Sequence, residues 1–140
     1  MSFVYERKIN YYETDKMGVV HHSNYIRYLE EARSRWMEDL GISMESVEEN
    51  GFTIPTLEVF CKYKSHVTSG DTIILEPKVT EFNGVRMKVE YKVIDKNTGK
   101  EIIEAWTKHC FTDIALKPIN IKKNNEKIYK IFEDLSKDEM

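Results

Sequence analysis

The chain has 140 residues, of which 41% are hydrophobic and 32% are charged, and its 21 basic and 24 acidic side chains give a net charge of -3. This composition is sufficient for one folded core and excludes a disordered chain, and the slightly acidic balance argues against nucleic-acid binding. The unbroken apolar runs are far shorter than the about 20 residues of a transmembrane helix, so we expect no membrane span.

The N-terminus and the cysteines predict the setting of the protein. The first ten residues carry charge where a signal peptide needs an apolar stretch, which predicts a cytoplasmic protein. Cys61 and Cys110 cannot form a disulfide framework and lack zinc-site spacing, so we expect inert thiols. We expect a single domain over residues 1–140, with its core at about 3–119 and a C-terminal helical appendage at about 124–136.

The N-terminal segment has the alternating pattern of a half-buried strand. Its apolar face is formed by Phe3, Tyr5, Ile9 and Tyr11, with Arg7 as the one exception on that face. The alternation stops over residues 13–20, where Gly18 gives the backbone freedom to turn. We therefore expect a strand followed by a loop.

A long amphipathic helix follows this loop. Apolar residues at helical spacing form one continuous stripe: Tyr25, Tyr28, Leu29, Ala32, Trp36 and Leu40. Ser23 is a candidate N-cap, and Gly41 is placed to end the helix in the left-handed conformation. A second short helix is expected at residues 43–50.

The rest of the chain is predicted to be mainly β-structure. Alternating residues predict strands at about 57–63, 73–79, 85–93 and 103–111, and Asn83-Gly84 is a strong hairpin signal. A short amphipathic helix is expected at about 128–135. Short connections predict a mostly antiparallel sheet, and with one long helix packed against it the fold class is α+β.

Reactive side chains concentrate at residues 11–25, between the first strand and the long helix. A helix N-terminus offers unpaired N–H donors and a partial positive charge, which suit a developing oxyanion. A carboxylate in the preceding loop, such as Asp15, can attack a carbonyl carbon or activate water beside that helix end. Taken alone, however, Asp15 is more often a turn or capping residue, and His22 is more often structural.

Other interpretations of these residues stay open from the pattern alone. Asp15, His21 and His22 could hold a metal ion, although adjacent histidines at a helix start point to different sides. Glu13 is expected to be solvated. His66 and His109 lie on predicted strands and are expected to be surface or hydrogen-bonded histidines.

One extended motif changes this balance. The segment T-D-x-x-G-V-V-H-H-x-N-Y at residues 14–25, followed by E-E-A-R-S-R-W at 30–36, closely resembles the 4-hydroxybenzoyl-CoA thioesterase-like family. Within that family, the YbgC-like acyl-CoA thioester hydrolases are the most similar branch. Weaker matches follow in order to residue 119. The resemblance implies a hotdog fold, in which a five-stranded, mostly antiparallel sheet wraps around one long central helix, here with a short C-terminal helix added.

The resemblance also implies catalytic residues. Asp15 matches the family's catalytic aspartate, which acts as nucleophile or general base. His22 matches the histidine that assists in the YbgC-like branch, and its backbone N–H corresponds to the donor that polarises the thioester carbonyl. His21 stands where this branch usually has an aromatic residue, and His66 stands where a later motif usually has a proline.

Substrate contacts are expected along the same motif. The acyl-CoA is expected to contact Gly18, Val20, His21, Asn24 and Tyr25. The phosphates and adenine of coenzyme A are expected to meet basic residues, with Lys64 and Arg86 as the first candidates.

The leading hypothesis is hydrolysis of acyl-CoA thioesters to free acid and coenzyme A, with water as second substrate and no cofactor or metal. The alternatives are an acyl-carrier-protein thioesterase and a non-catalytic acyl-CoA-binding hotdog protein. Asp15 with His22 favours catalysis, because binding alone needs no such pair. An exposed sheet edge predicts a homodimer or homotetramer, because pairing of edges between subunits would cover it.

Overall fold

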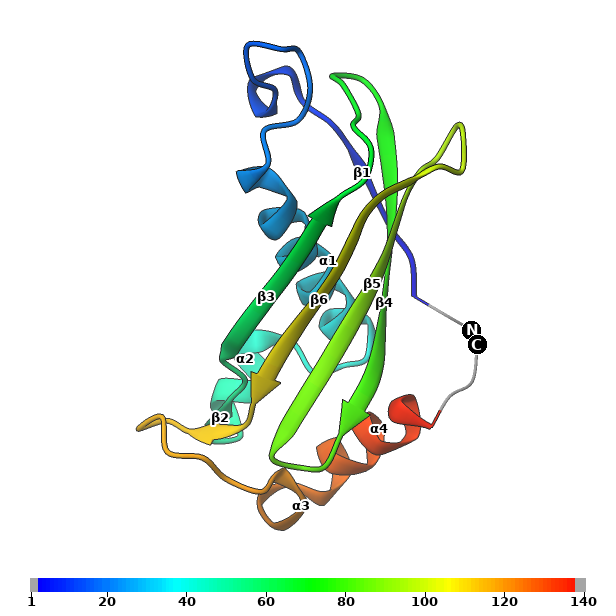
Figure 1. Cartoon of the computed structure of the whole chain (residues 1–140). Helices are drawn as coiled ribbons and strands as arrows, with labels where there is room; N and C mark the ends of the chain where they lie inside the picture. The colour runs from blue at the N-terminus through cyan, green and yellow to red at the C-terminus, as the bar shows by residue number, and fades with distance from the viewer. Residues whose placement is uncertain (1–2, 138–140) are drawn as a thin grey trace. The chain divides into compact units, whose positions relative to one another are not determined.

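The computed structural model describes residues 3–137 and contains a five-stranded sheet and a long helix, α1, which spans Ser23–Asp39 (Figure 1). The strands lie in the order β1-β4-β5-β6-β3, with bounds Tyr5–Lys8 (β1), Thr72–Phe82 (β4), Arg86–Asp95 (β5), Glu101–Cys110 (β6) and Thr56–Tyr63 (β3). The shorter elements are η1 (Tyr11–Glu13), α2 (Met44–Glu49), β2 (Phe52–Thr53), β7 (Thr112–Asp113), α3 (Ile121–Asn124) and α4 (Glu126–Ser136). This arrangement confirms the α+β class.

The described residues group into two compact units, each made of three segments. Unit 1 contains residues 3–36, 60–77 and 91–105, and unit 2 contains residues 37–59, 78–90 and 106–137. That residues 1–140 form a single domain stays a prediction.

In unit 1, the apolar stripe of α1 is buried as predicted. Its side chains Tyr25, Tyr28, Leu29, Ala32 and Trp36 all belong to the core. Full burial of a large apolar side chain contributes roughly 1.5–3 kcal/mol, so this stripe is a main source of stability for the unit. Polar contacts at the flank of the helix add to it, because Nη1 of Arg33 donates a hydrogen bond to the Tyr91 hydroxyl on β5 at 3.0 Å.

In unit 2, an aromatic cluster forms the core. Phe82 packs against Phe111 and Phe132 with ring centroids 5.8 Å apart in both pairs, and Phe111 packs against Phe132 at 5.7 Å. Phe132 and Ile128 are the buried residues of α4, which confirms the predicted C-terminal amphipathic helix. The predicted Asn83-Gly84 turn is also confirmed, since Gly84 has a φ of +92° and joins β4 to β5.

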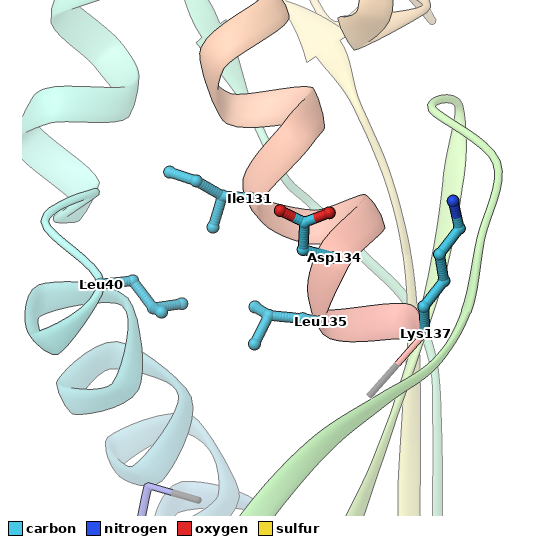
Figure 2. A pocket seen from close by; sticks show the side chains of 5 residues that line it. All are labelled: Leu40, Ile131, Asp134, Leu135 and Lys137. Carbon is cyan, nitrogen blue, oxygen red and sulfur yellow. The ribbon is translucent and has the colours of Figure 1, made fainter. Parts of the chain in front are cut away.

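Unit 2 also has a shallow pocket of about 450 Å³ between the end of α1 and α4 (Figure 2). Its apolar lining comes from Leu40, Ile131 and Leu135. Its one carboxylate, that of Asp134, lies 3.4 Å from Nζ of Lys130. Figure 2 shows the apolar side chains facing one another, with Asp134 and Lys137 as the two charged lining residues. Both charges are paired, since Nζ of Lys137 lies 3.9 Å from the Glu133 carboxylate.

Three details of the sequence prediction were wrong. The first strand ends at Lys8, and the chain then turns through η1, so Tyr11 is 81% exposed instead of extending the apolar face. Ser23 is the first residue of α1, and its hydroxyl hydrogen-bonds Nδ1 of His21 instead of capping the helix. The helix ends at Asp39, before Leu40, although Gly41 does adopt the expected left-handed φ of +81°.

Two short features were not foreseen. Residues of β2 and β7 form a separate two-stranded antiparallel sheet, and α3 precedes α4. None of the helices in residues 3–137 has the length and apolar character that crossing a membrane requires.

Candidate active site

The loop between β1 and α1 is closed on itself by backbone hydrogen bonds. The N–H of Asp15 donates to the carbonyl of Val19 at 2.8 Å, and the N–H of Gly18 donates to the carbonyl of Asp15 at 2.9 Å. Gly18 has a φ of +82°, which a side chain would disfavour, so glycine is favoured at this turn. The result is a tight hairpin-like loop with Asp15 at its entry.

The same loop is tied to the start of α1 and to the neighbouring chain. The N–H of His21 donates to the carbonyl of Glu13 at 2.9 Å, and the N–H of Val20 donates to the carbonyl of Val67 at 3.0 Å. Asp15 lies only two residues beyond Glu13, and the helix begins two residues beyond His21. These bonds therefore hold Asp15 close to the N-terminus of α1.

One N–H at the helix start is left unpaired. The N–H of Ser23 donates to Nδ1 of His21, and those of Asn24 and Tyr25 donate to the carbonyls of His21 and His22. The N–H of His22 has no acceptor among residues 3–137. It is a free donor at the positive end of a 17-residue helix.

The Asp15 side chain is half-buried and partly engaged. Its Oδ1 accepts a hydrogen bond from the N–H of Met17 at 2.8 Å, which fixes the carboxylate in a turn. Its Oδ2 makes no hydrogen bond to the part of the chain that the structure describes. One oxygen therefore orients the group, and the other is available to accept a proton.

An aromatic group lies beside the helix start. The rings of His21 and His22 are 4.3 Å apart, and His22 makes an edge contact with Tyr63 on β3 at 6.1 Å. Tyr63 also contacts Tyr25 at 5.7 Å. Burial, and then the proximity of Tyr63, raises the pKa of Tyr25 to about 12, so Tyr25 is a neutral phenol at physiological pH.

Glu13 does not behave as the sequence suggested. It was expected to be solvated, but it is only 6% exposed and receives two hydrogen bonds from the Arg7 guanidinium, at 3.0 and 2.6 Å. The sequence carried one signal of this pair, namely the charged Arg7 on an otherwise apolar strand face. A charge on such a face implies a buried partner.

The remaining predicted residues divide between the two units. Val20 is buried in the loop of unit 1, and the side-chain amide of Asn24 donates to the carbonyl of Glu13 at 2.9 Å. Nζ of Lys64 lies 3.1 Å from Glu101 and 3.3 Å from Glu104, so its charge is already paired. Arg86 is an exposed residue of unit 2.

A metal centre finds no support among the described residues. Within residues 3–137, no three His, Cys, Asp or Glu side chains are arranged to hold an ion. The chemically useful pair is instead the Asp15 carboxylate and the free His22 N–H. A carboxylate and an unpaired N–H donor held in one loop are groups that the hydrolysis of an activated acyl bond can use.

Comparison with known proteins identifies the family. The model of the thioesterase-like superfamily matches residues 9–132, and the chain therefore belongs to that superfamily. A protein of Aquifex aeolicus, provisionally named an esterase, is 33% identical over 110 residues, which cover 79% of this chain and 84% of the relative. The acyl-CoA thioesterase YbgC of Haemophilus influenzae is 26% identical over 125 residues, which cover 86% of this chain and 89% of the relative.

Solved structures confirm the hotdog fold. The DHNA-CoA thioesterase from Staphylococcus aureus aligns with a TM-score of 0.87 at 23% identity, over 94% of this chain and 88% of that chain. The family and the fold together make this chain a thioester hydrolase.

Proposed function

We propose that this thioester hydrolase cleaves acyl-CoA thioesters into free acid and coenzyme A, using Asp15 and the backbone N–H of His22. The observation that carries the proposal is the unpaired His22 N–H at the start of α1, in the same hydrogen-bonded loop as the half-engaged Asp15 carboxylate. The names of two relatives, YbgC from Haemophilus influenzae and YneP from Bacillus subtilis, support acyl-CoA as the substrate class.

In the proposed reaction, the thioester carbonyl oxygen accepts a hydrogen bond from the His22 N–H. Asp15 Oδ2 takes a proton from water as the water oxygen attacks the carbonyl carbon. The negative charge that develops on the carbonyl oxygen is stabilised by the N–H and by the positive end of the helix. When the C–S bond breaks, the proton passes from Asp15 to the departing thiolate, and the acid and coenzyme A leave.

A thioester needs no further activation, since its carbonyl carbon is already electrophilic. We therefore propose that the reaction needs no metal and no cofactor. A cytoplasmic location also stays a prediction. The YbgC-like branch is favoured by the motif at residues 14–25. Coenzyme A contacts at Lys64 would have to compete with Glu101 and Glu104 for its charge.

We also propose that the active form is a homodimer or homotetramer. β3 lies at the edge of the sheet and exposes large apolar side chains, with Leu57, Val59 and Tyr63 between 41% and 48% exposed. An apolar edge strand favours pairing with another chain. A second copy is the simplest cover for it.

A hydrolysis screen tests the proposed function. Aromatic acyl-CoAs and aliphatic acyl-CoAs of increasing chain length are incubated with the wild-type protein, and release of free thiol is followed with and without EDTA. We expect turnover that EDTA leaves unchanged. Turnover only with acyl-carrier-protein substrates would assign the alternative thioesterase activity, and tight binding without thiol release would assign an acyl-CoA-binding protein.

A further inference from the structure

Unit 1 contains a partly buried ion-pair network, Glu31–Arg7–Glu13, that the proposed reaction does not use. The Arg7 guanidinium on β1 lies between two carboxylates, donating from Nε to Glu31 at 2.8 Å and from Nη1 and Nη2 to Glu13 at 3.0 and 2.6 Å. The Arg7 and Glu13 side chains are only 16% and 7% exposed. The guanidinium also lies 4.8 Å above the centroid of the Tyr28 ring. The Arg7 guanidinium is thus held by Glu31, by Glu13 and by the Tyr28 ring.

Glu13 connects the ion pair with Arg7 to the loop through its own hydrogen bonds. Its Oε1 accepts the N–H of Asn10 at 2.9 Å, which closes η1. Its backbone carbonyl accepts two further hydrogen bonds at 2.9 Å, from the N–H of His21 and from the side-chain amide of Asn24. Glu13 is therefore the point where β1, η1 and the start of α1 meet, two residues before Asp15.

The network is a costly way to stabilise a fold. Burying an ion pair removes two charges from water, and an apolar pair of similar volume often stabilises as well or better. An apolar pair, however, does not fix the orientation of its two side chains. A bidentate guanidinium–carboxylate contact fixes both the distance and the orientation of its partners.

We propose that the Arg7–Glu13 ion pair is the positioning device of this active site, setting the place of Asp15 relative to the free N–H of His22. The inference rests on the proposed function, because it assigns Glu13 a role through Asp15. Glu13 and Arg7 are positioning residues and do not touch the substrate.

The test uses Glu13→Gln, which keeps the size of the side chain and an oxygen for the N–H of Asn10. It removes the negative charge that holds Arg7. Misplacing a catalytic group by about 1 Å can cost about a hundredfold, so we expect kcat to fall by about 10- to 100-fold, with KM changed by less than about threefold. Assays are run well below the melting temperature of each variant.

The matched control is Glu6→Gln on the same strand. It also removes one carboxylate from an ion pair, that of Lys96 with Glu6 at 2.8 Å, but this pair is exposed and has no contact with the loop. We expect its kcat to stay within about twofold of wild type, because exposed pairs contribute little. An equal loss of kcat in Glu6→Gln and Glu13→Gln would overturn the proposal.

The coupling with Asp15 gives a sharper test. If Glu13 acts only through Asp15, then adding Glu13→Gln to Asp15→Asn should lower kcat by less than about twofold further, because residues that act as one unit are not additive. A full additional loss in the double variant would show that Glu13 acts independently of Asp15.

A readout without substrate separates this inference from the proposed function. In Glu13→Gln, hydrogen exchange should accelerate at the amides of Asp15, Gly18 and His21, which close the loop. Exchange at the amides of Asp95 and Lys96, in the β5–β6 turn of the same unit, should stay unchanged. If wild type cleaves no thioester, the proposed function fails while this measurement still tests the positioning of the loop. Unchanged exchange at the three loop amides would overturn the positioning role whatever the activity.

Discussion

The side-chain amide of Asn24 donates a hydrogen bond to the backbone carbonyl of Glu13 at 2.9 Å, joining the first turn of α1 to the loop that carries Asp15. The sequence motif marks Asn24 as a substrate contact, but its amide already has a partner within the fold. Part of the motif therefore specifies the shape of the loop, and only part is free to meet a substrate.

Asn24→Ala tests this role. Loss of one half-buried hydrogen bond should lower the free energy of unfolding by about 1 kcal/mol and should loosen the link between loop and helix. We expect kcat to fall by about 3- to 30-fold, since misplacement by a fraction of an ångström already weakens catalysis. The matched control is Asn125→Ala in unit 2, which removes the N-cap of α4. The control should lose similar stability, measured by urea unfolding, and keep its kcat.

Asp15→Asn tests the proposed base. The amide oxygen can still accept the N–H of Met17, so the turn should persist, while the negative charge that takes the proton is lost. We expect kcat to fall at least about a hundredfold, because general base catalysis typically contributes 10²- to 10⁴-fold. Asp95→Asn is the control, since its carboxylate caps a turn in the same way by accepting the N–H of Asn97. Turnover of the Asp15 variant within about threefold of wild type would end the catalytic assignment.

The two parts of His22 can be separated by substitution. His22→Ala removes the ring and keeps the backbone N–H, so we expect kcat to fall by less than about tenfold. His22→Pro removes the N–H itself and should lower kcat by about 10²- to 10³-fold, the usual cost of losing an oxyanion donor. Circular dichroism and the melting temperature establish that α1 is intact in the proline variant. Equal losses in the two variants would place the importance of His22 in its ring.

The helix and the main strands could be predicted from sequence because their signals are local and repeated. The stripe that includes Tyr28 and Trp36 defines α1 without knowledge of any partner, and Asn83-Gly84 defines a hairpin by itself. The two-residue strands β2 and β7 are too short to show any period. Their pairing depends on contacts between residues far apart in the sequence, which a local pattern does not contain.

The burial of Glu13 in the candidate site also could not be predicted from a local sequence pattern. A glutamate between Tyr12 and Thr14 has no local feature that marks it as buried. Its burial depends on Arg7, six residues earlier, being turned back toward it by η1, and the alternating pattern predicted that the strand continued there. The catalytic candidates were found through a family motif, but the groups that hold them in place required the fold.

The buried Glu13 should make stability depend on pH. Burial alone would raise its pKa, but the N–H of Asn10 and the Arg7 guanidinium outweigh that effect and lower the pKa below the ordinary value of 4.5. A carboxyl with a lowered folded pKa contributes stability above its unfolded pKa, and this contribution is lost as pH falls through the folded value. The melting temperature of wild type should therefore exceed that of Glu13→Gln at pH 7, and the difference should shrink below about pH 4.5. A difference that stays constant down to pH 3 would contradict an ionised, paired Glu13.

The proposed oligomer depends on the edge strand β3. Val59 is 41% exposed on this strand, so Val59→Lys places a charge in the middle of the apolar edge without disturbing a core residue. If two copies pair there, the charge must be desolvated on assembly, and light scattering should show a shift from a multiple of 16.6 kDa toward the monomer mass. Met44→Lys is the control, because Met44 has a similar exposure of 44% but lies on α2. A wild-type protein that is monomeric at micromolar concentration would refute the oligomer. A dimer that Val59→Lys leaves intact would instead move the interface away from β3.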